Sequence, residues 1–312
     1  MVEDPAYRET IAETLSEGLP VLSITVSDDA FFGPDGIYSN PQNSGADFEV
    51  PIELEYSDPA DLDATFRLEA GIRIHGGNAR DHPKKPFRLY FRDDYGGKLR
   101  FPMFKDSPVD SFRQLVLREG GHDGWSLAGS GFEIAGLPPN LWIPPHASFL
   151  RDQFIRRTEV EMGVLSPRGK YVYVYINQRF WGLYDLHERP NADFFSDHLG
   201  GVDDDWDVMH HPETFAQDHV VVNGNDTAWV ALQELADKGV SSDADYEAMQ
   251  QYLDMPDYID SLVPRIWSGD FDWAGPMFIG GEDVTVFNNK NWYAGRRSRG
   301  EAGKFKVFTW DA

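Results

Sequence analysis

Apolar and polar residues alternate along much of the first half of the chain. The alternation is clear in residues 48–56 (FEVPIELEY), 64–77 (ATFRLEAGIRIHGG) and 86–92 (PFRLYFR). In the last of these, the residues divide between two faces, one holding Phe87, Leu89 and Phe91 and the other Arg88, Tyr90 and Arg92. A period of two residues predicts half-exposed strands. We therefore expect the first half to form a mainly antiparallel sheet.

Other segments complete the predicted N-terminal elements. Residues 9–19 have the apolar spacing of a helix, and residues 19–27 (LPVLSITVS) predict a strand. Residues 31–45 are rich in turn-forming residues and predict a loop. Residues 170–188 (KYVYVYINQRFWGLYDLHE) predict a hairpin with its turn at Asn177-Gln178.

Helical spacing dominates the second half. It predicts helices over residues 147–163, 227–238, 246–253 and 258–267, followed by a strand at 305–311. The chain is therefore predicted to be an α+β protein with two lobes. The sheet-rich N-terminal lobe is expected over residues 1–190 and the helix-rich lobe over residues 191–312. Because the sequence stops directly after a strand that ends in Asp311, we expect the second lobe to be incomplete here.

Composition narrows the class of protein. The chain has 312 residues, 41% of them hydrophobic and 14% aromatic, which is enough for a substantial core and argues against disorder. There is no cysteine, so disulfides and thiolate chemistry are excluded. A net charge of -24 argues against nucleic acid as a partner, because the phosphate backbone would be repelled. No apolar run approaches the roughly 20 residues of a membrane span, and the first residues do not form a signal peptide.

A basic segment stands out against this acidic background. Residues 71–92 carry one acid, Asp81, and six cations: Arg73, Arg80, Lys84, Lys85, Arg88 and Arg92. Two strands joined by a Gly-Gly turn would bring several of these together, and backbone N–H groups with a lysine form a phosphate-binding site. The alternative is a hairpin whose cations pair with acids on the same sheet. No Walker A sequence is present.

Five later residues have oxygen-bearing side chains suited to phosphoryl transfer. Glu188 follows a predicted strand, Asp270 and Asp272 follow a predicted helix, Asn291 lies in the stretch NNKNW, and Asp311 ends the last strand. Each has a structural alternative, such as a helix cap or a surface ion pair. Their order is more informative. A lysine for the phosphates, an aspartate as base, and an amide with a final aspartate for Mg²⁺ are the parts of a phosphoryl-transfer site.

At these residues the chain resembles the CotH kinase family, the atypical protein kinases similar to spore coat protein H. The similar stretches are GIRIHGGNAR with PKKPFRLYFR, LVLREGGHDGW, FLRDQFIRRTEVEMG, VYVYINQRFWGLYDLHERPNADF, SGDFDW, NKNWYAGRR and FKVFTWDA. The resemblance implies an atypical two-lobed kinase fold that uses ATP and Mg²⁺ or Mn²⁺. It also implies transfer of the γ-phosphate to Ser or Thr of a protein.

The resemblance assigns roles by position. Lys84 would bind the ATP phosphates, with Lys85 as the alternative and Arg73 and Arg88 beside them, and Glu188 would steady the lysine. Asp272 would be the catalytic aspartate and Asp270 its alternative. Asn291 and Asp311 would hold the metal. Because a longer segment, residues 275–289, separates Asp272 from Asn291, the alternatives for the amide ligand are Asn288 and Asn289.

Two other functional classes compete with an extracytoplasmic bacterial kinase carried on a larger exported protein. The first is a non-catalytic, kinase-like structural or adhesin module, which would bind no nucleotide. The second is a carbohydrate-active enzyme, suggested by nine Trp and many acids, which would need two carboxyl groups about 5 Å apart. The sequence does not give an oligomeric state.

Overall fold

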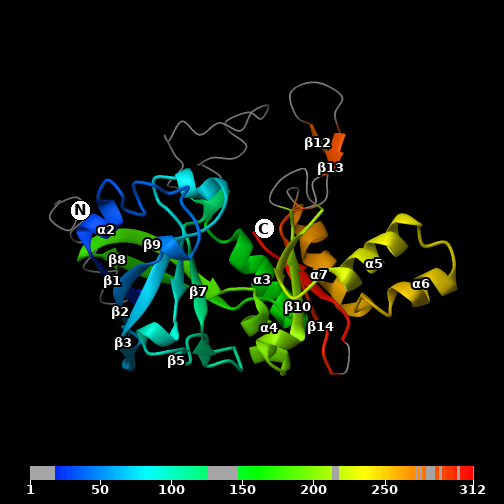
Figure 1. Cartoon of the computed structure of the whole chain (residues 1–312), viewed down its shortest axis with the longest axis horizontal. Helices are drawn as coiled ribbons and strands as arrows, with labels where there is room; N and C mark the ends of the chain where they lie inside the picture. The colour runs from blue at the N-terminus through cyan, green and yellow to red at the C-terminus, as the bar shows by residue number, and fades with distance from the viewer. Residues whose placement is uncertain are drawn as a thin grey trace. The chain divides into compact units, whose positions relative to one another are not determined.

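The computed structural model divides the chain into two units (Figure 1). It describes residues 18–124, 147–212, 218–270, 273, 276–278, 285–287, 290–300 and 303–311. Unit 1 comprises the described residues up to 124, residues 147–149 and residues 169–189. Unit 2 comprises residues 150–168 and the described residues from 190 onward. The helix expected over residues 9–19 lies almost wholly outside the described residues.

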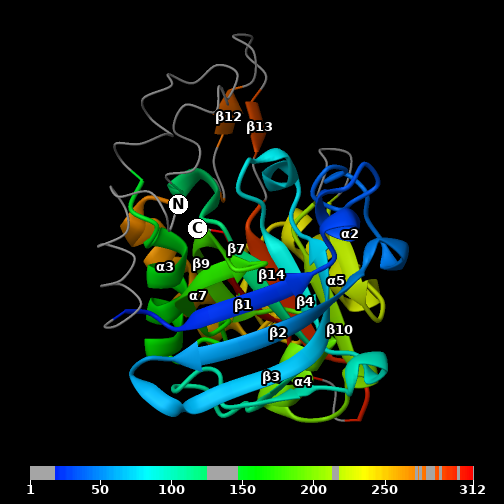
Figure 2. The ribbon, with the colours of Figure 1, turned by 90° about the vertical axis from the view of Figure 1, so that its left-hand side faces the viewer.

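Unit 1 is built on a closed barrel with the strand order β1-β2-β3-β4-β7-β9-β8. Its strands are β1 (Val21–Val26), β2 (Val50–Asp58), β3 (Asp61–Ile74), β4 (Phe87–Tyr90), β7 (Gln114–Arg118), β8 (Gly169–Ile176) and β9 (Arg179–Glu188). Neighbouring strands are antiparallel except β1 and β8, whose parallel pairing closes the barrel. The strands β1, β2 and β3 lie side by side in Figure 2.

Smaller elements surround the barrel. They are helix α2 (Asp28–Phe32), the short strand pair β5 (Leu99–Arg100) and β6 (Ser111–Phe112), and 3₁₀ turns at Ala46–Phe48, Asn78–Asp81, Asp93–Tyr95 and Gly121–Asp123. The 3₁₀ turn at Asn78–Asp81 falls between β3 and β4, inside the basic segment.

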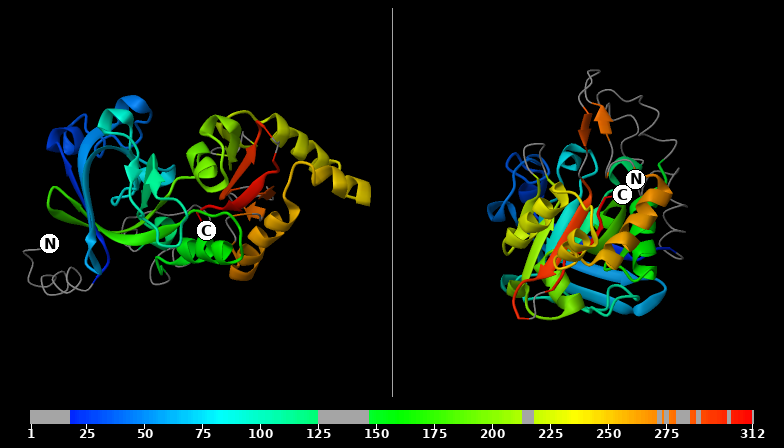
Figure 3. Two further views of the ribbon diagram at one scale, coloured as in Figure 1. Left: turned by 90° about the horizontal axis from the view of Figure 1, so that it is seen from below. Right: turned by 90° about the vertical axis from the view of Figure 1, so that its right-hand side faces the viewer.

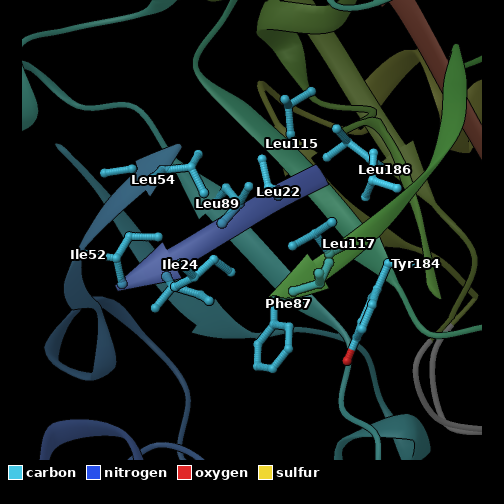
Figure 4. Packing of buried hydrophobic residues seen from close by; sticks show 14 of the residues in the cluster. Leu22, Ile24, Ile52, Leu54, Phe87, Leu89, Leu115, Leu117, Tyr184 and Leu186 are labelled. Atoms are coloured by element: carbon cyan, nitrogen blue, oxygen red, sulfur yellow. The ribbon is translucent and has the colours of Figure 1, made fainter. Parts of the chain in front are cut away.

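The barrel interior holds the main core of unit 1. Alternate residues of the strands point inward and pack against one another, as Figure 4 shows for side chains of β1, β2, β4, β7 and β9. Phe87 and Leu89 of β4 are fully buried, as the alternation predicted. The predicted hairpin is confirmed by the pairing of β8 with β9. Its two turn residues, Asn177 and Gln178, have φ of 48° and 65°, the positive values of a two-residue hairpin turn.

Unit 2 contains a four-stranded sheet in the order β11-β10-β14-β15. The strands are β10 (Trp206–His210), β11 (Val220–Asn223), β14 (Trp292–Arg297) and β15 (Lys306–Thr309), and β12 (Pro276–Phe278) pairs with β13 (Thr285–Phe287) separately. The helices are α3 (Arg151–Glu161), α4 (Ala192–Leu199), α5 (Thr227–Asp237), α6 (Asp243–Met249) and α7 (Met255–Ser268), with a 3₁₀ turn at Asp203–Asp205.

Helices cover both faces of this sheet. Phe194 and Phe195 of α4 pack with Val208, Tyr293 and Phe308 on one side. Aromatic and aliphatic residues of α5 and its surroundings pack on the other side, against Met209, Trp292, Ala294 and Val307. Gly295 is required by the first contact, since a Cβ there would lie 2.3 Å from the Phe195 ring. Helix α7 packs along β15, the red strand in Figure 3.

The observed elements give an α+β protein, as predicted. The described part of the chain has mixed sheets and the six helices α2–α7. The four helices and the last strand expected from residue 147 onward are present with shifts of a few residues at their ends. The sheet of unit 2 was not foreseen beyond that strand, and α3 belongs to unit 2, whereas the expected lobe boundary lay near residue 190. In the described residues, no helix combines the length and the apolarity that crossing a bilayer requires.

Candidate functional site

Asn291 and Asp311 lie at the same end of the β14–β15 pair in unit 2. The register pairs Trp292 with Thr309, and the backbone N–H of Trp310 continues the ladder by donating to the carbonyl oxygen of Asn291 at 2.9 Å. Both residues adopt positive φ, 63° for Asn291 and 60° for Asp311. Such conformations are uncommon for residues other than glycine and concentrate at functional sites. The fold thus brings two predicted metal ligands together.

Asp270 is fixed by the way helix α7 ends. Gly269 has a φ of 71° and terminates the helix. The next backbone N–H, that of Asp270, donates to the carbonyl oxygen of Arg265 at 3.0 Å. This is the pattern of a Schellman motif. The charge of Asp270 acts to raise the pKa of Arg265 against the effect of burial. Asp272 lies outside the described residues.

The two ends of the longer segment between Asp272 and Asn291 lie close together. Its strands β12 and β13 pair antiparallel, Pro276 with Phe287. At its base, the backbone N–H of Lys290 donates to the carbonyl oxygen of Trp273 at 3.4 Å. The residue after Asp272 therefore lies beside the residue before Asn291, whatever the length of the insertion. The alternative amide ligands, residues 288 and 289, lie outside the described residues.

A buried polar network lies behind this end of the sheet. Glu159 of α3 accepts hydrogen bonds from the backbone N–H of Thr309 at 2.9 Å and from its hydroxyl at 2.5 Å. Arg265 of α7 donates from Nε to the Thr309 hydroxyl at 2.6 Å and from Nη2 to the carbonyl oxygen of Asn291. Glu159 and Arg265 are 0% and 2% exposed. Three distant segments are thus joined through two buried charged side chains.

Burial shifts the pKa of both charged groups. It raises the pKa of Glu159 to about 7, although the hydrogen bonds from Thr309 and the charge of Arg265 act in the other direction. Burial lowers the pKa of Arg265 to about 10, against the charges of Glu159 and Asp270. Desolvation therefore destabilises the charged forms of Glu159 and Arg265 by more than the attraction between the two charges stabilises them.

The donors at the β14–β15 end suit a hard divalent cation. A carboxylate from Asp311 and an amide from Asn291 are the oxygen ligands that Mg²⁺ and Mn²⁺ prefer. Among the described residues, no group of three or more His, Asp or Glu side chains could hold a metal by itself. Mg²⁺ commonly takes one or two protein carboxylates and completes its octahedron with water and substrate phosphates. The donor set fits that mode of binding.

Lys84 is the partly exposed lysine of the basic segment in unit 1. Its Nζ donates to the carbonyl oxygens of Leu183 and, at 3.4 Å, Glu119. It lies 4.4 Å from the centre of the Tyr184 ring and 5.0 Å from that of Phe149. Burial lowers the pKa of Lys84 to about 8, and the charge of Glu119 acts in the other direction. The result is a desolvated cation whose hydrogen-bond partners are neutral.

Lys85 has a structural role. It is 5% exposed, and its Nζ donates to the carbonyl oxygens of Arg80 at 2.7 Å and His82 at 3.3 Å. The Tyr38 ring lies 4.8 Å away, and burial lowers the pKa of Lys85. These contacts fix the turn before β4. Of the two lysines, Lys84 is therefore the better placed to meet a ligand.

Two arginines of the segment, Arg73 and Arg92, follow the structural alternative of pairing with an acid. Arg73 and Arg92 both donate to the carboxylate of Glu49, at distances of 2.6 to 3.1 Å. Burial alone would raise the pKa of Glu49, but the hydrogen bonds and charges of the two arginines lower it. Arg88 contacts the His75 ring at 2.9 Å. The predicted roles of Arg73 and Arg88 toward phosphate stay predictions, and the observed contacts are those of a paired sheet surface.

The carboxylate whose charge acts on Lys84 is that of Glu119. Glu119 is 1% exposed, and its Oε1 lies 3.0 Å from Nδ1 of His82. Glu188, the acid expected to steady the lysine, is not among the partners of Lys84. It pairs in register with Leu115 on β7 and lies five positions beyond Leu183 on β9, about 16 Å along the strand. Its role stays a prediction.

Comparison with known families adds an independent observation. The family model described as CotH kinase protein matches residues 145–312, more than half of the 312 residues. The chain belongs to the CotH kinase family. No curated protein shows a significant match to it. The matched residues include Glu188, Asp272, Asn291 and Asp311. Both strands β14 and β15 lie within the match.

The CotH match begins after the basic segment. Lys84, Lys85, Arg73 and Arg88 precede residue 145, so their roles rest on the sequence pattern and on the contacts in unit 1. Sequence reasoning also missed Glu159, Arg265 and Glu119. Glu159 and Arg265 lie on helices, where charged residues are usually solvated, and Glu119 lies in the stretch LVLREGG, whose partner on the barrel is distant in sequence. The signal that could have revealed these residues is a charged side chain at a position where the apolar period of the element predicts a buried residue.

Proposed function

We propose that this chain is a metal-dependent CotH-family protein kinase with a two-lobed, kinase-like arrangement. It would transfer the γ-phosphate of ATP to a Ser or Thr hydroxyl of a protein outside the cytoplasm, in the presence of Mg²⁺ or Mn²⁺. The observation that carries the proposal is the meeting of Asn291 and Asp311 at one end of the β14–β15 pair, where the chain after Asp272 also returns.

In this proposal the residues act by positioning and by charge. Lys84 would bind phosphate oxygens, and at neutral pH its pKa of about 8 keeps most of the ammonium protonated. Asp272, or Asp270 in its place, would accept the proton of the attacking hydroxyl. Asn291 and Asp311 would hold the metal ion. The metal, when bound, neutralises negative charge on the phosphates.

The charge of the protein supports a local cation at such a site. With a net charge of -24, the chain repels ATP on average. Arg73 and Arg92 share the single carboxylate of Glu49, whereas Lys84 donates to uncharged carbonyl groups. A phosphate would offer this lysine a stronger, charge-assisted partner. Phosphate binding would also raise the lysine pKa back toward its ordinary value.

The test is phosphoryl transfer from γ-labelled ATP with Mg²⁺ or Mn²⁺ and a generic Ser/Thr acceptor protein, with self-labelling monitored. Lys84→Met and Asp311→Asn should each abolish labelling. Lys170→Met is a matched control, because Lys170 also lies in unit 1, contacts a tyrosine ring and has a pKa lowered by burial to about 8. Labelling that survives in both site variants would contradict the proposal.

The second candidate is a non-catalytic, kinase-like structural or adhesin module. It is favoured by the small donor set among the described residues, where no group of three acids or histidines gathers. This alternative predicts that ATP with Mn²⁺ leaves the thermal unfolding midpoint unchanged. A nucleotide-dependent rise in that midpoint, lost in Asp311→Asn, would exclude it.

A further inference from the structure

One buried arginine contacts all the segments that carry the proposed metal and base residues. Arg265 donates to the carbonyl oxygen of Asn291 and to the hydroxyl of Thr309, two residues before Asp311. Its guanidinium lies 5.0 Å from the centre of the Trp273 ring, and Trp273 directly follows Asp272. The charge of Asp270 also acts on it. In unit 2, Arg265 therefore joins the end of α7, the start of β14 and the end of β15.

Stability alone does not account for this arrangement. Buried ion pairs are often no more stabilising than apolar side chains of the same volume, because desolvation opposes their attraction. Here Arg265 and Glu159 are both almost fully buried and meet through Thr309 rather than directly. What the network does supply is fixed geometry. It holds the carbonyl group of Asn291 and the backbone of Thr309, two residues before Asp311, and both Asn291 and Asp311 have positive φ.

We infer that Arg265 is a positioning residue for the metal-binding end, which it orients through Asn291 and Thr309. Glu159, on α3, serves as its anchor by holding Thr309 from the other side. The inference rests on the proposed function, since it gives Arg265 a role toward the ion that Asn291 and Asp311 would hold. It adds a residue that makes no contact with substrate or ion itself.

The shape of the arginine side chain explains why this residue type is present. Two donors of one planar guanidinium, Nε and Nη2, reach the last residue of β15 and the residue before β14 at the same time. A lysine has a single nitrogen on a flexible stem and does not reproduce a planar fork. Arg265→Lys keeps the charge and removes this geometry. It therefore separates electrostatic support from positioning.

Arg156 is the matched control for a merely structural arginine. It lies in the same unit, on α3, and is 1% exposed. Its Nε donates to Asp152 at 2.9 Å and its Nη1 to the carbonyl oxygen of Pro167 at 3.1 Å. Neither of these two partners belongs to the β14–β15 end. Arg156→Met and Arg265→Met should both lower the unfolding midpoint, but only the second should alter metal binding.

The experiment measures Mn²⁺ binding to the full chain by electron paramagnetic resonance, without nucleotide, together with thermal unfolding. We expect Arg265→Lys and Arg265→Met to weaken Mn²⁺ binding by about 10-fold or more, the size of effect typical for residues that orient metal ligands. Thr309→Val, which keeps the arginine and removes only the hydroxyl, should shift binding in the same direction. This variant decides the question if the arginine variants do not fold.

The outcomes separate the two proposals. Mn²⁺ binding that is normal in folded Arg265→Lys and in Thr309→Val overturns the positioning role and leaves the kinase proposal intact. A wild-type chain that neither binds Mn²⁺ nor transfers phosphate overturns the proposed function, and the positioning role with it. Equal weakening in Arg156→Met would also overturn the inference, because it would make the effect one of general stability.

Discussion

Thr309 donates two hydrogen bonds to one carboxylate oxygen of Glu159, from its backbone N–H at 2.9 Å and from its hydroxyl at 2.5 Å. The two residues are 150 positions apart in the sequence. This contact fixes the last strand against α3 two residues before Asp311. The same hydroxyl accepts from Arg265, so the position of the proposed metal ligand depends on a carboxylate that has no contact with solvent.

The burial of Glu159 should appear in the pH dependence of stability. Its pKa is about 7 in the folded protein and near 4.5 when unfolded. Between these values the folded state keeps a proton that the unfolded state has released. The unfolding free energy should therefore fall as pH rises from about 4.5 to 7, by about 3 kcal/mol, and then level off.

Glu159→Gln cannot ionise and should remove that decline. Urea unfolding of wild type and variant at pH 5 and pH 7.5 measures it, with Glu161→Gln as the control on the exposed side of the same helix. If the wild type and Glu159→Gln lose the same stability over this interval, Glu159 is not the group responsible.

A second prediction concerns Lys84 and nucleotide binding. Because the pKa of Lys84 is about 8, half of the ammonium groups lose their charge at that pH in the free protein. The value of kcat/KM for ATP should therefore fall about tenfold per pH unit above pH 8. Lys84→Arg stays charged throughout and should extend the plateau at reduced activity. An unchanged break in this variant would assign the titration to another group.

Gly295 provides a test of packing in unit 2. A Cβ at this position would lie 2.3 Å from the ring of Phe195, which has no room to move in the core. Gly295→Ala should destabilise the protein by about 1–3 kcal/mol through overpacking, measured by urea unfolding. Gly303→Ala is the control, since its Cβ would meet neighbours no closer than 3.4 Å. Equal stability of the two variants would contradict the packing of α4 on the sheet.

Local sequence patterns predicted most helices and strands, because the spacing of apolar residues that are near one another in the sequence differs between the two. Phe87 and Leu89 alternate with polar residues and are indeed buried, and two turn residues sufficed for the β8–β9 hairpin. The parallel pairing of β1 with β8 joins segments about half the chain apart. No local period encodes such a partner, so the closure of the barrel was not foreseen.

The candidate site, too, could be predicted from the sequence only in part. Asn291 and Asp311 could be singled out by residue type and order, but their meeting depends on the register of β14 with β15. Arg265 looked like an ordinary polar residue of an amphipathic helix. It proved to be buried because Thr309 and Asn291, both far away in sequence, supply its acceptors. The tertiary structure determines which groups a buried charge contacts. A single sequence does not reveal these contacts.

The last prediction asks which acid sets the charge of Lys84. Glu119 acts to raise the pKa of Lys84 against the effect of burial, whereas Glu188 lies farther along β9. Glu119→Gln removes a neighbouring negative charge, so it should lower the lysine pKa further and move the break in kcat/KM for ATP below pH 8. Glu188→Gln should leave the position of the break unchanged, whatever it does to the rate. The pH profiles of the two variants decide between the acids: a break that moves only in Glu188→Gln would restore the pairing expected from the sequence and remove Glu119 from the site.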